Sequence, residues 1–110
     1  MSFVEKWRKT LYKSLENIKR EMQCAENLES ILSTQTSLLG ICDMVNMMLE
    51  SPNKDKHEMH IIEGKALVNS ELVRMEINAK QYEELNDITC SRFTNEVIDR
   101  IMEATHEWRT

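Results

Sequence analysis

Two Gly and one Pro among 110 residues constrain this chain more than any other feature. Both residue types interrupt regular structure, and the turns between strands are built largely from them, so their scarcity favours a few long helices. Alternating runs of Val, Thr and Tyr with polar residues, which would indicate strands, are absent. The length leaves room for one domain. We therefore predict a single all-α domain over residues 1–110.

A first helix is predicted over residues 3–50. Ser2 and Glu5 have the S-x-x-E spacing of a capping box, in which each side chain satisfies a backbone N–H at the helix start. The stretch "STQTS" (residues 33–37) lowers helix propensity, because hydroxyl side chains compete for backbone hydrogen bonds. The helix either continues through this stretch or breaks there to give three helices. Apolar residues recur at steps of three and four, the pattern of one helix face: Val4, Trp7, Leu11, Leu15, Ile18, Met22, Ala25, Leu28 and Leu32.

A loop is predicted over residues 51–57, where the chain has its one Pro and no large apolar side chain. Asp55 and Glu58 repeat the capping-box spacing, so a second helix is expected over residues 56–108. Its apolar pattern slips in phase between Leu85 and Phe93, which a change of packing partner or supercoil would explain.

Two helices of about 45–50 residues joined by a short loop form a long antiparallel hairpin. Such a hairpin buries one stripe of each helix, yet both helices have additional apolar residues outside that stripe. We expect these residues to bind a partner, so that the hairpin assembles into a dimeric four-helix bundle or joins another helical protein. The expected partner-binding residues are Met44, Met47, Met48, Leu67, Val73, Ile77, Ile98 and Met102.

The segment from residue 3 to residue 20 is basic, although the chain has a net charge of −5. In the predicted hairpin it lies opposite the acidic stretch 96–107, so the charges would fix the register and Trp7 would pack near Trp108. A partner protein is a second explanation. A third is an anionic membrane surface, bound through Phe3, Trp7, Lys9 and Lys13. Nucleic acid is not expected, because net acidity opposes phosphate binding.

Cys24, Cys42 and Cys90 are an odd number of cysteines without a C-x-x-C motif, and the hairpin register brings no two of them together. No segment has the pattern of a secretory signal or of a membrane-spanning helix. Free thiols in a reducing intracellular setting are therefore expected, with the cytoplasm as the expected location.

Few residues suggest catalysis or metal binding. His57, His60 and Glu63 share a helix face at steps of three and are the best metal candidates, although such residues are also common at solvated helix starts. The pair Glu26 and Glu29 has the i, i+3 spacing with which carboxylates on facing helices hold Mg²⁺. We predict no cofactor and a non-enzymatic interaction module, such as a scaffold, adaptor or regulatory subunit. The alternatives are a peripheral membrane-binding protein and a divalent-metal-dependent all-α hydrolase.

Overall fold

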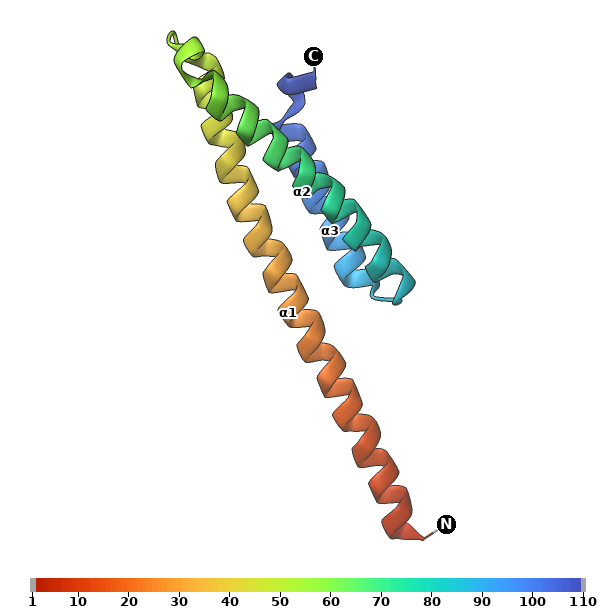
Figure 1. Cartoon of the computed structure of the whole chain (residues 1–110). Helices are drawn as coiled ribbons and strands as arrows, with labels where there is room; N and C mark the ends of the chain where they lie inside the picture. Colours follow the sequence, from red (N-terminus) through yellow and green to blue (C-terminus); the bar gives the residue numbers. More distant parts are fainter. Residues whose placement is uncertain (1, 110) are drawn as a thin grey trace.

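The computed structural model describes residues 2–109, and this part of the chain is all-α, as predicted. Helix α2 runs antiparallel to α1, and α3 then returns parallel to α1, so that α2 and α3 both pack against the second half of α1 (Figure 1). The molecule measures 78 × 19 × 17 Å. The elements are α1 (Phe3–Glu50), the 3-10 helix η1 (Lys54–His57), α2 (Glu58–Glu84), α3 (Ile88–Ala104) and the 3-10 helix η2 (His106–Arg109).

The predicted first helix is confirmed as one continuous helix, α1, about 72 Å long at 1.5 Å per residue. It begins as expected, because the Ser2 side chain accepts a hydrogen bond from the backbone N–H of Glu5. The "STQTS" stretch does not break it. Thr36 Oγ1 donates to the Leu32 carbonyl at 3.1 Å, so this hydroxyl bonds within the helix instead of competing with it.

The prediction of one helix over residues 56–108 is wrong, because the chain reverses after Glu84. Asn86 has φ = 62°, the left-handed conformation that ends many helices, and the Asp87 N–H bonds back to the Tyr82 carbonyl at 2.8 Å. The Asp87 side chain then caps α3 by accepting from the Cys90 N–H at 3.1 Å. The phase slip in the sequence thus marks a turn, and the two-helix hairpin becomes a three-helix body.

The second helix also begins later than predicted. Residues 54–57 form η1, and α2 starts at Glu58 with His57 as its N-cap. The predicted capping box of Asp55 and Glu58 does not form, because the N-cap of α2 is His57 and not Asp55. The His57 side chain makes no capping hydrogen bond.

The core lies where the three helices face one another. Gly64 allows α1 and α2 to approach near the loop, since a Cβ at this position would lie 2.5 Å from Val45 Cγ2. Gly40 has no atom within 4 Å of an added Cβ, so it marks no such close approach. The buried cluster consists of Ile31, Leu38, Cys42, Val68, Leu72, Met75, Cys90, Val97, Ile98 and Ile101.

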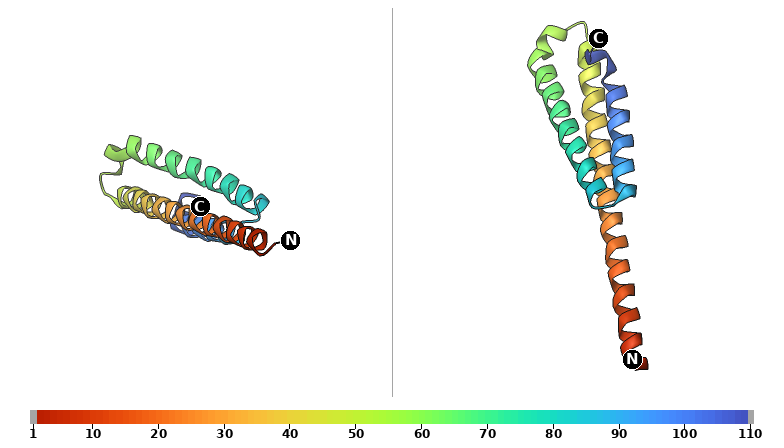
Figure 2. Two further views of the ribbon diagram at one scale, coloured as in Figure 1. Left: turned by 90° about the horizontal axis from the view of Figure 1, so that it is seen from below. Right: turned by 90° about the vertical axis from the view of Figure 1, so that its right-hand side faces the viewer.

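Because α2 and α3 cover the second half of α1, its first half extends beyond the body (Figure 2). We call residues 3–23 the arm; every residue in it is exposed. The predicted pairing of the basic start of the chain with the stretch 96–107 is therefore wrong. The predicted contact between Trp7 and Trp108 is also wrong, because Trp108 donates from Nε1 to Asn46 Oδ1 at 2.7 Å, at the opposite end of the molecule.

Candidate interaction surface

The arm has a continuous apolar stripe with no covering element in the described chain. We call it the arm stripe. At about 100° per residue its members lie within about 80° of one another around the helix axis. Between 43% and 59% of each side chain is exposed. The arm stripe consists of Val4, Trp7, Leu11, Leu15, Ile18 and Met22.

The arm stripe faces away from the side of α1 that packs in the body. The same geometry places it about 170° around the helix from Ile31, Leu38, Cys42 and Val45, the buried residues of α1. A continuation of α2 or α3 along α1 would therefore leave the arm stripe uncovered. A second molecule that approaches α1 from the opposite side is needed to bury it.

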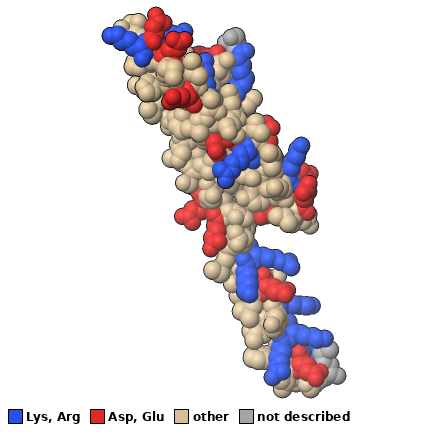
Figure 3. All heavy atoms as spheres, viewed as in Figure 1, with Lys and Arg blue, Asp and Glu red and all other residues tan. Residues whose placement is uncertain are grey.

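The basic residues of the arm lie on its other face. Lys6, Lys9, Lys13 and Arg20 fall on the side of α1 where α2 and α3 are found further along the helix. In the space-filling view the Lys and Arg side chains of the arm project mainly to this side (Figure 3). Residues 3–20 have a net charge of +4, so the remaining chain has −9.

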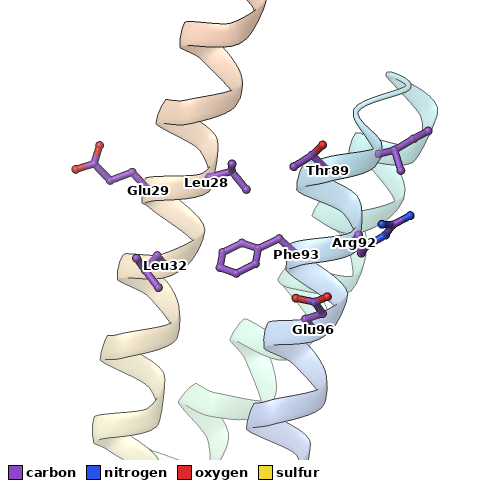
Figure 4. Close-up of a pocket in the computed structure, with 8 residues that line it drawn as sticks. Leu28, Glu29, Leu32, Thr89, Arg92, Phe93 and Glu96 are labelled. Atoms are coloured by element: carbon purple, nitrogen blue, oxygen red, sulfur yellow. The ribbon is translucent and has the colours of Figure 1, made fainter.

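A hollow lies between α1 and α3, just above the arm, and has a volume of 520 Å³. Leu28 and Phe93 point into it from the two helices, whereas the Arg92 side chain extends away (Figure 4). Glu29 and Glu96 also line it, but the Glu29 carboxylate points away from α3 (Figure 4).

The predicted partner-binding residues lie on all three helices and differ in exposure. Met44, Met47, Leu67, Val73, Ile77 and Met102 are exposed, but they are distributed over α1, α2 and α3. Met48 is half-buried. Ile98 is buried in the core, so its assignment to a partner surface is wrong: the return of α3 turns it inward.

The predicted metal ligands do not converge either. His57 is half-buried in η1, and His60 and Glu63 are exposed on α2. Within residues 2–109, the ligand atoms of one group of three such side chains lie within 4.8 Å of one another, and that group is Cys24, Asp87 and Cys90.

The prediction that no two cysteines meet is also wrong. All three thiols are free, but Cys24 Sγ and Cys90 Sγ lie 3.8 Å apart. Burial, followed by hydrogen bonding to Asp87 and Cys24, raises the pKa of the Cys90 thiol to about 12. Sequence reasoning missed this cluster because only the reversal at Asn86 brings the start of α3 next to α1. The Asn-Asp pair at the phase slip, a helix stop followed by an N-cap, is the signal that could have revealed it.

No protein-family model, curated protein or solved structure matches this chain. In the part of the chain that the structure describes, none of the helices combines the length and the apolar character needed to cross a bilayer.

Proposed function

We propose that this protein is a non-enzymatic helical interaction module that self-associates through the arm stripe. The observation that carries the proposal is the arm itself: about 20 residues of well-formed amphipathic helix with the apolar face exposed. A helix of this kind gains most of its stability from packing of its apolar face, so an isolated arm would be marginal in water. A partner that buries the arm stripe would supply the packing that stabilises this helix.

The spacing of the arm stripe favours another helix as that partner. From Leu11 through Leu15, Ile18 and Met22 to Ala25 the steps are four, three, four and three residues, the heptad spacing of a coiled-coil seam. Two such stripes together expose on the order of 1,200 Å² of apolar surface, the lower limit for specific stable interfaces. A second copy of this chain supplies the matching stripe.

The charge distribution is compatible with a second copy and favours an antiparallel pair. Lys6, Lys9 and Lys13 lie on the far side of the arm from the seam, so two arms would meet without opposing their basic faces. In a parallel pair the two acidic bodies would lie side by side. In an antiparallel pair they lie at opposite ends, and each basic arm extends toward the acidic body of the other copy.

The same charges make a lipid surface the weaker candidate. An in-plane amphipathic helix binds anionic headgroups through basic side chains near the edges of its apolar face. Arg8 and Lys19 lie near such an edge, whereas Lys9 and Lys13 point away from the apolar side. Phe3 and Trp7 do fit an interfacial position, so binding to vesicles is the competing outcome in the test below.

The test is the solution mass of the full chain by light scattering at two protein concentrations. We expect a dimer with an elongated shape. The double variant Leu11→Gln/Leu15→Gln should be monomeric, whereas the matched variant Lys9→Gln/Lys13→Gln should remain a dimer, because it changes the same helix turns on the other face. A monomeric wild-type chain would overturn the proposal. So would a monomer that binds anionic vesicles and loses this binding in the Leu variant.

A further inference from the structure

Three side chains with metal-ligating atoms meet where the arm joins the body. Cys24 belongs to α1, Asp87 caps α3, and Cys90 lies in the first turn of α3. Cys90 is buried, and the other two are half-buried. Cys24 is separated along the chain from Asp87 by 63 positions and from Cys90 by 66 positions, and the α2–α3 turn brings them together.

The spacing of the two sulfur atoms fits a tetrahedral metal. With Zn–S bonds of about 2.3 Å, two thiolate ligands of a tetrahedral zinc ion lie about 3.8 Å apart. Cys24 Sγ and Cys90 Sγ are separated by 3.8 Å. A disulfide, by contrast, would require the sulfurs to approach to about 2.05 Å. A metal could therefore bind between the two sulfurs without moving them apart.

The carboxylate is held on the same side of the cluster. Asp87 Oδ1 accepts a hydrogen bond from the Cys90 N–H at 3.1 Å and lies 4.0 Å from Cys24 Sγ. The helix cap therefore fixes the carboxylate beside the thiols before any metal arrives. Two thiolates and one carboxylate oxygen form a donor set that zinc accepts.

The cluster is also accessible. Cys24 and Asp87 line an open groove of 570 Å³ between the end of the arm and the α2–α3 turn. Asn27 and Tyr82 line the same groove. The groove provides an entry path and room for a water molecule as a fourth ligand.

We propose that Cys24, Asp87 and Cys90 bind one zinc ion, with a water molecule from the groove in the fourth position. On binding, both thiols release their protons to solvent, and the metal undergoes no change of oxidation state. The ion would fasten the α2–α3 turn to α1 at the point where the arm leaves the body. This site is independent of self-association through the arm stripe.

The test uses the full chain, reduced and metal-free, titrated with Co²⁺ as a spectroscopic substitute and then with Zn²⁺. We expect one equivalent of Co²⁺ to produce thiolate-to-cobalt charge-transfer absorption, and one equivalent of Zn²⁺ to abolish it. Zinc should also raise the thermal midpoint, because it binds the folded state. Cys24→Ser should remove the absorption, and Cys42→Ser, which changes the cysteine outside the cluster, should not.

Asp87→Asn separates the two roles of the aspartate. Asn is as good an N-cap as Asp, so the metal-free variant should keep its stability while its zinc affinity falls at least tenfold. Absence of charge-transfer absorption in the folded wild-type chain would overturn the proposal and identify the cluster as two packed thiols. Absorption that survives in Cys24→Ser would overturn it as well.

Discussion

Trp108 and Asn46 are joined by a hydrogen bond of 2.7 Å from the indole Nε1 to the side-chain Oδ1. Asn46 also donates from Nδ2 to the Ala104 carbonyl at 3.1 Å, so one side chain of α1 satisfies a carbonyl at the end of α3 and the indole N–H of η2. Lys65 Nζ lies 5.9 Å from the centre of the Trp108 ring and adds a cation–π contact from α2. All three helices are therefore linked at the end of the body opposite the arm.

Replacing Asn46 should destabilise the protein. Asn46→Ala leaves the part-buried indole N–H and the Ala104 carbonyl without this partner, which costs about 1–3 kcal/mol of unfolding free energy. Urea denaturation followed by circular dichroism measures the change. Asn69→Ala, at an exposed position of α2, is the control and should change the stability by less than about 0.5 kcal/mol. Equal stabilities of the two variants would contradict the structural role of Asn46.

The two glycines should respond in opposite directions to the same substitution. Gly40→Ala places a methyl group in open space and should stabilise α1 by about 0.5–1 kcal/mol through helix propensity. Gly64→Ala forces a methyl group against Val45, a buried β-branched residue that cannot easily shift, and should destabilise by about 1–3 kcal/mol. Thermal unfolding of both variants checks this difference in sign. A stabilising Gly64→Ala would mean that α1 and α2 do not approach so closely.

Asn86 should tolerate glycine but not alanine. Its φ of 62° is accessible to Gly at no steric cost, whereas a Cβ without a local hydrogen-bonding group is disfavoured there by about 1–2 kcal/mol. We expect Asn86→Gly to have nearly wild-type stability and Asn86→Ala to lose about 1 kcal/mol. Urea unfolding of the pair measures it. If alanine were as stable as glycine, α2 and α3 would be joined as one helix through this position.

The stability should fall in alkaline solution, and Cys42 should contribute to this fall beside Cys90. Burial, with a smaller contribution from the charge of Asp43, raises the pKa of the Cys42 thiol above its usual value of 9.0. The unfolded chain therefore loses the Cys42 proton at a lower pH than the folded chain does. The stabilisation is present below pH 9.0 and is lost as the pH rises above it. The pH dependence of the urea midpoint from pH 8 upward measures this, and Cys42→Ala should show a shallower decline; an unchanged slope would contradict the assignment.

The sequence by itself determined the helical content and the extent of α1. Scarce Gly and Pro, the Ser2 cap and the regular apolar steps are local features, and helix formation depends on local hydrogen bonds. The Thr36 hydroxyl could also be accommodated locally, which is why the "STQTS" stretch remains helical.

Only the tertiary structure decided where the second half of the chain goes. The reversal involves only the short turn around Asn86, yet it turns Ile98 from an expected surface residue into core and moves Trp108 away from Trp7. It also brings Cys90 to Cys24. A short-range pattern specifies which face of a helix is apolar, but the partner of that face depends on contacts between residues distant in sequence. For this reason the exposed arm stripe and the Cys24–Asp87–Cys90 cluster emerge only when the three helices are packed together.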